Sequence, residues 1–315
     1  MTTVREALGR SRALGVASLD SQLLLARALA TTRTRLIAAD DRDLTPDEAR
    51  QWENWLERRL AGEPIAYLLG EKEFHGLLLE VSGDVLVPRP ETELLVDWAS
   101  AVVAALAGRR SGKAGSTARE AGLGEPRVGE SGVGKPDVGE PGDGESGAGP
   151  IRIVDLGTGS GAIALALKRS HLRAEVTAAD VSAAALAVAR RNADRLGLAV
   201  ELVESSWWRG LDARRFDVAV ANPPYIAAAD PHLAALRHEP SVALTPGADA
   251  LAALREIVAG AASHLAPGGG LLCEHGFDQG SAVRDLLGAA GFVGIETRRD
   301  LAGHERATGG RRADR

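Results

Sequence analysis

Short apolar runs alternate with longer amphipathic stretches from residue 151 onward. The expected strands lie at residues 151–156, 175–179, 200–203, 216–221, 270–274 and 294–298, and the expected helices at 161–170, 182–196, 248–265 and 280–290. The first and fourth strands are apolar almost throughout, which is typical of strands buried on both faces. This alternation predicts a doubly wound, parallel α/β sheet that binds ligands in the crevice at the carboxyl ends of its strands.

The sequence before this α/β part divides into segments of different texture. Residues 1–72 have helical patterns, including a helix start at Thr45-Pro46, and predict a small helical domain suited to contacting a partner. Residues 73–90 predict a linking β-hairpin whose two strands flank a turn at Ser82-Gly83-Asp84. Residues 91–109 predict a helix that leads toward the α/β domain of residues 151–315.

Residues 110–150 form a low-complexity insertion rich in Gly, Pro and Glu. From Leu123 a five-residue unit repeats, as LGEPR, VGESG, VGKPD, VGEPG and DGESG. A mixture of Gly, Pro, Ser and charged residues does not build a packed core. We therefore expect this segment to be a flexible and expendable linker.

Charge and cysteine content narrow the kind of protein. The net charge is −6, and residues 1–90 carry 12 basic and 14 acidic side chains while residues 151–315 carry 19 of each. Proteins that coat nucleic acid need clustered cations, so this balance argues against nucleic acid as a partner. Cys273 is the only cysteine, and the sequence has neither a signal peptide nor an apolar run of about 18 residues, which predicts a cytoplasmic protein without membrane association. The seven histidines show no metal-ligand spacing, so no metal is expected.

A glycine-rich loop, Asp155-Leu156-Gly157-Thr158-Gly159-Ser160-Gly161, follows the first expected strand. Its glycines allow a tight turn and a close approach of the backbone to a ligand. Dinucleotide sites also have a glycine-rich first turn, but with G-x-G-x-x-G spacing, and Asp155 would repel a pyrophosphate. Asp180 ends the second strand, where a carboxylate can bind ribose hydroxyls, and Trp207 follows the third strand, where its ring can stack on adenine. These features favour the cation S-adenosylmethionine over NAD.

The strand at residues 216–221 runs into Asn222-Pro223-Pro224-Tyr225. Proline donates no hydrogen bond and its φ is fixed near −65°, so the strand stops at Asn222 and the chain after it is stiff. An amide, a carbonyl and an aromatic face are thereby held at the carboxyl end of a strand. Such a corner is suited to holding a planar group that bears an NH2.

These motifs resemble the release-factor glutamine methyltransferases, the PrmC/HemK family of class I methyltransferases. The resemblance is carried by Gly62-Glu63-Pro64-Ile65-Ala66-Tyr67-Leu68, Glu73-Phe74, Val87-Pro88-Arg89-Pro90-Glu91-Thr92-Glu93, the glycine-rich loop, Asn222-Pro223-Pro224-Tyr225-Ile226, His238-Glu239-Pro240 and Glu274-His275-Gly276. It implies a Rossmann-like, seven-stranded and mostly parallel sheet with a final antiparallel strand near residues 305–309, a five-helix-type N-terminal domain and a linking hairpin. The implied reaction moves the methyl group of S-adenosylmethionine to N5 of the glutamine in the Gly-Gly-Gln motif of peptide chain release factors, leaving S-adenosylhomocysteine.

The resemblance also implies the residues of the site. The cofactor contacts expected are Asp155, Gly157, Thr158, Gly159, Ser160, Gly161, Asp180, Trp207 and Asn222, and the substrate contacts are Asn222, Pro223, Pro224, Tyr225, Phe74 and Arg89. For catalysis, Asn222 Oδ1 and the Pro223 carbonyl would accept the two amide N–H groups, and Tyr225 would pack against the amide plane. One departure from the family is Ser206, at a position where many relatives have an Asp.

Three other functions remain open at this point. The corner at Asn222 would also serve a DNA adenine methyltransferase acting on a flipped base, although the charge balance and the lack of a basic target-recognition module argue against it. A glutamine methyltransferase for a ribosomal protein would share the whole site. The third alternative is a non-catalytic adaptor that binds partners through its helices. The intact glycine-rich loop and Asn222 argue against this function.

Overall fold

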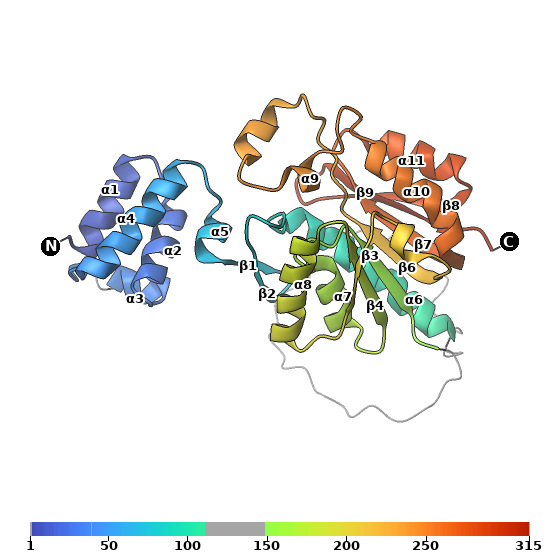
Figure 1. Cartoon of the computed structure of the whole chain (residues 1–315), viewed down its shortest axis with the longest axis horizontal. Coiled ribbons are helices and arrows are strands. Elements are labelled where there is room, and N and C mark those ends of the chain that lie inside the picture. The colour runs from blue at the N-terminus through green and yellow to red at the C-terminus, as the bar shows by residue number, and fades with distance from the viewer. Residues whose placement is uncertain (1, 39, 111–148, 315) are drawn as a thin grey trace.

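The computed structural model describes residues 2–38, 40–110 and 149–314 (Figure 1). A group of N-terminal helices lies at one end, and a larger α/β body carries the rest of the described chain. The predicted repeats between residues 111 and 148 lie outside the described residues.

The N-terminal helices are α1 (Val4–Ala13), α2 (Ser18–Ala28), α3 (Arg33–Ala38), α4 (Pro46–Leu60) and α5 (Ile65–Leu69). The helix start predicted at Thr45-Pro46 is confirmed, because the Thr45 hydroxyl accepts from the backbone N–H of Glu48 and the Glu48 carboxylate accepts from that of Thr45. Trp52 on α4 is buried in a small core together with Leu24 and Leu25 of α2. Packing between short amphipathic helices therefore forms this part of the molecule.

The linking hairpin differs from the one that the sequence predicted. Its strands are β1 (Glu71–Phe74) and β2 (Leu77–Glu80), paired antiparallel, and the turn falls at His75 and Gly76 instead of residues 82–84. Both turn residues have positive φ, 49° and 73°, the conformation whose twist matches that of two-residue hairpins. Residues 85–87 form no strand, and this segment passes over the α/β body instead.

The α/β body is built on a seven-stranded sheet in the order β5-β4-β3-β6-β7-β9-β8. Its strands are β3 (Arg152–Leu156), β4 (Glu175–Asp180), β5 (Glu201–Glu204), β6 (Phe216–Ala221), β7 (Leu265–Glu274), β8 (Phe292–Arg299) and β9 (Glu305–Arg312). β3 to β7 pair in parallel, whereas β9 lies antiparallel between β7 and β8. The doubly wound sheet and the final antiparallel strand are thus confirmed.

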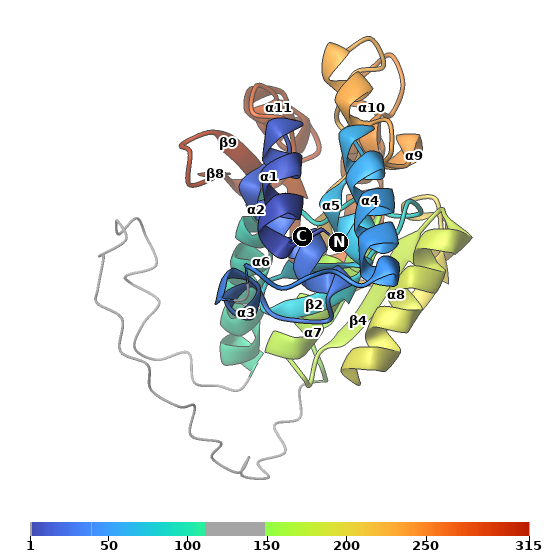
Figure 2. The same cartoon turned by 90° about the vertical axis from the view of Figure 1, so that its left-hand side faces the viewer.

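Helices cover both faces of this sheet. The long α6 (Glu93–Arg110) follows a short 3-10 turn η1 (Pro90–Thr92), and the remaining helices are α7 (Ala162–Ser170), α8 (Ala183–Leu196), α9 (Ser241–Leu244), α10 (Ala252–His264) and α11 (Gly280–Ala289). Short 3-10 turns, η2 (Arg209–Leu211) and η3 (Pro231–Leu236), lie in the connections. In Figure 2, α6, α7 and α8 lie in the lower part of the α/β body and α10 and α11 in the upper part, and the two groups pack on opposite faces of the sheet.

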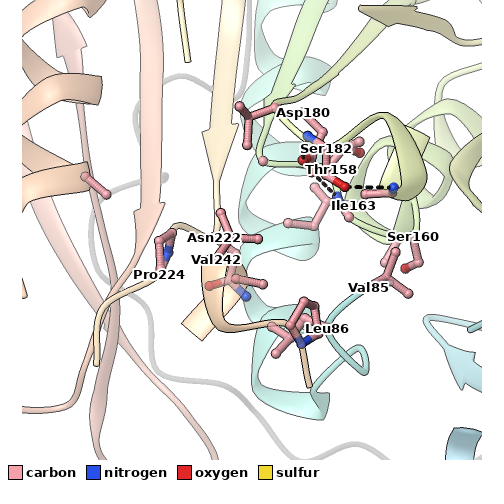
Figure 3. A pocket seen from close by; sticks show the side chains of 18 of the residues that line it. Val85, Leu86, Thr158, Ser160, Ile163, Asp180, Ser182, Asn222, Pro224 and Val242 are labelled. Atoms are coloured by element: carbon pink, nitrogen blue, oxygen red, sulfur yellow. Dashed lines mark hydrogen bonds between the residues drawn. The ribbon is translucent and has the colours of Figure 1, made fainter. Parts of the chain in front are cut away.

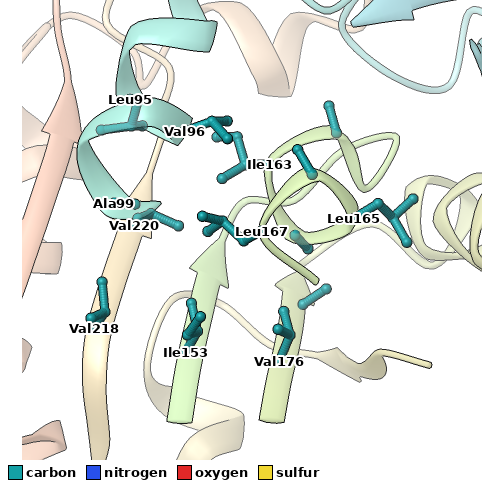
Figure 4. Close-up of a cluster of buried hydrophobic side chains, with 14 of the residues drawn as sticks. Leu95, Val96, Ala99, Ile153, Ile163, Leu165, Leu167, Val176, Val218 and Val220 are labelled. Carbon is teal, nitrogen blue, oxygen red and sulfur yellow. The ribbon is translucent and has the colours of Figure 1, made fainter. Parts of the chain in front are cut away.

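The core explains why the central strands are apolar throughout. On β6, Val218 and Val220 pack toward α6 and α7, while Ala219 and Ala221 pack toward α10 and α11. Figure 4 shows the first of these clusters, in which Leu95 and Val96 of α6 meet the strands. Full burial of one large apolar side chain contributes about 1.5–3 kcal/mol to the stability of the fold. The two clusters therefore fix the positions of the strands whose ends form the site.

Candidate active site

A cavity of about 420 Å³ opens at the carboxyl ends of β3, β4 and β6 (Figure 3). This is the edge of a parallel sheet at which doubly wound folds bind their ligands. The loops after these strands form one wall, and residues 84–89 together with segments 240–246 and 252–256 form the others. Among the predicted site residues, the following line it: Gly157, Thr158, Gly159, Ser160, Asp180, Trp207, Asn222, Pro224 and Arg89.

The glycine-rich loop after β3 needs its glycines for geometry. Gly157 and Gly159 have φ values of 76° and 56°, which side chains disfavour. The N–H groups of Gly157 and Thr158 both donate to the Ala179 carbonyl, at 2.8 and 3.0 Å, so the loop is tied to β4. Gly161 does not line the cavity. It is closely packed, because a Cβ there would lie 3.0 Å from Leu165 and 3.3 Å from Ala189. This third glycine lets α7 pack closely.

Asp155, a predicted cofactor contact, lies beneath the loop and is not among the residues that line the cavity. Side chains alternate along a strand, and this position of β3 faces α7. Its Oδ2 accepts from Thr158 Oγ1 at 2.6 Å and from the Ala164 N–H, in the first turn of α7, at 3.1 Å. Burial raises the pKa of Asp155 to about 7, although these two hydrogen bonds act in the opposite direction. Its carboxyl group therefore organises the loop from behind.

Asp180 at the end of β4 joins the loop to the cavity. One carboxylate oxygen accepts from the Gly159 N–H at 2.8 Å and the other from the Ser182 N–H at 2.9 Å. Burial raises the pKa of this carboxyl, against the hydrogen bonds from the backbone. Each oxygen retains acceptor capacity. Asp180 can therefore bind the hydroxyls of a sugar while it holds the loop in shape.

The two tryptophans after β5 have different roles. Trp207, whose φ is 51°, lies against Gly157, where an added Cβ would be 3.3 Å from its ring, and it lines the cavity beside Ser205 and Ser206. Trp208 is buried, donates from Nε1 to the Ile257 carbonyl at 2.8 Å, and stacks on His264. Trp208 is thus a core residue, whereas the ring of Trp207 is available to a ligand in the cavity.

Asn222 stands at the carboxyl end of β6, where the strand stops as predicted. Its Nδ2 donates to the Thr92 hydroxyl at 3.1 Å. Within the described residues, Oδ1 of Asn222 accepts no hydrogen bond, and the residue lines the cavity (Figure 3). Pro224 also lines it, whereas Pro223 is buried and does not. An amide oxygen is thus available to a ligand that carries N–H groups.

Besides Pro223, two further predicted substrate contacts, Tyr225 and Phe74, do not line the cavity. The Tyr225 hydroxyl donates to Oε1 of Glu274 at 3.4 Å. Burial, together with the nearby Glu274 carboxyl group, raises the pKa of Tyr225 to about 12. Tyr225 is not among the residues that line the cavity. Phe74 is buried in the core beneath α6 because the hairpin turn falls directly after it. Neither side chain touches the cavity in this structure.

Arg89 reaches the cavity as predicted and is held there by an acid. Its guanidinium donates to Oε1 of Glu239, and Oε2 of Glu239 accepts from the Val87 N–H at 3.1 Å. The Glu239 side chain is 2% exposed. This ion pair, in which only the Glu239 side chain is fully buried, holds the segment 85–90 at the wall of the cavity.

The sequence-based prediction did not include several residues that line the site. The walls include Val85 and Leu86, which were expected in a strand, and Ile163, Ser182 and Val242. Thr92 was interpreted only as part of a helix start. Pro88 and Pro90 were the available sign that this segment differs from a strand, because prolines on both sides of Arg89 prevent that residue from lying in a paired strand.

The described residues contain neither a candidate metal site nor a candidate membrane-spanning helix. No group of three or more His, Cys, Asp or Glu side chains in these ranges is arranged to hold a metal ion. No helix in the same ranges is long and apolar enough to cross a bilayer.

Comparison with known proteins places both parts of the chain. Residues 4–70 match the family model of the PrmC N-terminal domain, and residues 148–238 match that of the methyltransferase small domain. The release factor glutamine methyltransferase of Burkholderia pseudomallei is 44% identical over 309 residues, covering 95% of this chain and 94% of the relative. Those of Bordetella pertussis and Pseudomonas aeruginosa are each 43% identical and cover 94% and 93% of this chain, and 95% and 91% of their own lengths.

Proposed function

The chain belongs to the release factor glutamine methyltransferase family, and from this premise we propose that it methylates the glutamine of the Gly-Gly-Gln motif in peptide chain release factors. The methyl group passes from S-adenosylmethionine to N5, the side-chain amide nitrogen. The observation that carries the proposal at the site is Asn222, whose amide is held at the cavity by Thr92 and whose oxygen accepts no hydrogen bond from the described residues.

The cavity residues fit S-adenosylmethionine. Asp180 has acceptor capacity for the ribose hydroxyls, the ring of Trp207 is placed to stack on adenine, and the loop from Gly157 to Ser160 admits close approach of the backbone. When bound, this cofactor supplies an electrophilic methyl group on a sulfonium. Ser206 also lines the cavity, and its short side chain leaves space at the adenine end.

Positioning is the main task that remains for the protein. The lone pair of an amide nitrogen is delocalised into its carbonyl, so methyl transfer requires the nitrogen to be held in line and about 3–3.5 Å from the methyl carbon. Asn222 Oδ1 accepts one amide N–H. The other N–H is assigned to the backbone carbonyl of Pro223, which directly follows Asn222 although Pro223 is buried and does not line the cavity. These oxygens stabilise the positive charge that develops on nitrogen. The proton leaves after methylation, so the reaction needs no strong general base.

Tyr225 does not pack on the substrate amide in this proposal, because its hydroxyl faces Glu274 below the cavity. Arg89 and Pro224 are the remaining predicted substrate contacts that line the cavity. The helical N-terminal part, residues 1–72, is the docking domain for the release factor. It adjoins the α/β body through His238, whose Nε2 lies 3.1 Å from the Ala61 carbonyl.

A methyl-transfer assay tests this proposal. The protein is incubated with labelled S-adenosylmethionine and with either a release factor, the same factor with its Gly-Gly-Gln glutamine replaced by alanine, or duplex DNA. We expect label on the unaltered release factor alone. Label on DNA alone would overturn the proposal in favour of an adenine methyltransferase, and equal label on both release factors would place the reaction on another residue.

A further inference from the structure

A buried polar group adjoins Asn222 at one wall of the cavity. It contains Thr92 at the end of η1, Tyr225 after β6 and Glu274 at the end of β7. Thr92 and Glu274 are 4% and 1% exposed. The Thr92 hydroxyl accepts from Asn222 Nδ2 at 3.1 Å. It also lies beside the Glu274 carboxyl group and lowers the pKa of that group. Residues from three separate elements therefore meet beside the Asn222 amide.

The number of donors in this group decides which way the Asn222 amide points. A threonine hydroxyl has one hydrogen to donate and two lone pairs that accept. When Glu274 is ionised its carboxylate can only accept, so it attracts the Thr92 hydrogen and leaves the hydroxyl as an acceptor. Only the NH2 end of Asn222 can then bond to Thr92, and the oxygen end is turned to the cavity.

Folding stability does not explain why a carboxyl group lies here. Oε2 of Glu274 is buried without a hydrogen-bond partner in the described structure, and a buried carboxylate that is only partly paired costs free energy. Burial raises the pKa of Glu274 to about 7, with Glu91 raising it further and Arg306, Thr92 and Tyr225 lowering it. A site that retains such a group at a cost in stability indicates a use for it.

We propose that Thr92 and Glu274 are positioning residues, which fix the Asn222 amide with its oxygen toward the substrate glutamine. The inference rests on the proposed function, since it assigns these residues to the same methyl transfer. Without them the Asn222 amide can rotate by half a turn and present N–H groups to a substrate that also presents N–H groups. Bound glutamine would then be held less often in line with the methyl group.

The first test compares Thr92→Val with Thr92→Ser on the release-factor substrate. Valine keeps the shape of threonine but removes the hydroxyl, whereas serine keeps the hydroxyl. We expect kcat to fall about ten- to a hundredfold in Thr92→Val, with the Kd for S-adenosylmethionine and the melting temperature close to those of the parent. Thr92→Ser should recover most of kcat.

Three results of this comparison would overturn the inference. The first is an unchanged kcat in Thr92→Val. The second is a parallel loss of kcat, cofactor binding and thermal stability in that variant, because a purely structural role would give this result. The third is a failure of Thr92→Ser to recover kcat. A parent protein that methylates no release factor would overturn the proposed function and this role with it. An active parent with an unaffected Thr92→Val variant would overturn the positioning role alone.

The second test uses pH. When Glu274 is protonated, its hydroxyl can donate to Thr92, and the Thr92 hydrogen is then free to turn to Asn222 and favour the opposite amide orientation. The other groups that face Glu274 are Glu91, Tyr225 and Arg306, and Arg306 is paired with Asp300. The kcat of the parent should therefore fall below about pH 7. Glu274→Gln, which cannot gain a proton, should lack this fall, and an identical acid-side fall in both proteins would contradict the inference.

Discussion

Gly157 illustrates how the site depends on single atoms. Its φ of 76° is unfavourable for any residue with a Cβ, and a Cβ built there would lie 3.3 Å from the Trp207 ring. Trp207 itself has a positive φ of 51°. The loop and the ring are therefore fitted to each other, and the space between them cannot accept a methyl group without moving the ring that we assign to adenine.

Gly157→Ala should weaken cofactor binding more than it weakens the fold. Gly197 provides a matched control, because it has a similar φ of 64° at the end of α8 and no heavy atom within 4 Å of an added Cβ. Both alanine variants should lose about 1 kcal/mol of unfolding free energy. Only Gly157→Ala should raise the Kd for S-adenosylmethionine, by about tenfold, as measured by calorimetry. Equal Kd values in the two variants would contradict the assigned contact.

The sequence predicted the identity of the site residues better than their orientation. Asp180, Trp207 and Asn222 were expected at strand ends and lie at the cavity, because the ends of parallel strands meet at one edge of the sheet. Asp155 and Tyr225 were expected there too, but their side chains point below it. Which way a side chain points depends on strand register and on partners such as Ala164 and Glu274, which sequence patterns alone do not reveal.

At the scale of elements, the segment 85–92 is the main difference from the sequence-based prediction. Turn residues at 82–84 suggested a hairpin, yet the two positive φ values at His75 and Gly76 place the turn earlier. The remaining residues have no strand to pair with, and they form a strap across the cavity that carries Val85, Arg89 and Thr92. The pairing partner of a short strand is a tertiary property, which explains why local propensity failed here.

Glu239→Ala should loosen this strap. The change leaves the Arg89 guanidinium and the Val87 N–H without the acid that holds them, which should cost about 2–3 kcal/mol. Glu53→Ala is the matched control, because Glu53 pairs with Arg10 on the surface, where the two side chains are 51% and 60% exposed. Chemical denaturation should show a change within about 0.5 kcal/mol for the control. A loss no larger for Glu239→Ala would show that the strap is held by other contacts.

At the scale of the whole molecule, the ends of the insertion are close together. Arg110, the last residue of α6, donates from Nη1 to the carbonyls of Gly149 and Pro150 at 3.2 and 3.1 Å. Its Nη2 also donates to Asp217 at 2.6 Å. The Arg110 side chain therefore links the end of α6 to the start of β3.

Deletion of residues 112–148 should leave methyl transfer within about twofold of the parent, since both flanks are held by Arg110. Loop-closure entropy changes slowly with length, so the free energy of unfolding should change by no more than about 1–2 kcal/mol. Steady-state kinetics with a release factor and chemical denaturation measure the two quantities. A large loss of kcat/KM with an intact fold would give the insertion a part in substrate binding.

The central claim is that the Asn222 amide holds a release-factor glutamine for methylation, and mass spectrometry of that glutamine tests it most directly. The parent protein should add one methyl group to the Gly-Gly-Gln glutamine. Asn222→Ala should lower kcat by at least about a hundredfold while the Kd for S-adenosylmethionine stays within about threefold. Parent-like turnover in Asn222→Ala, or a methyl group found on a different residue, would contradict the account.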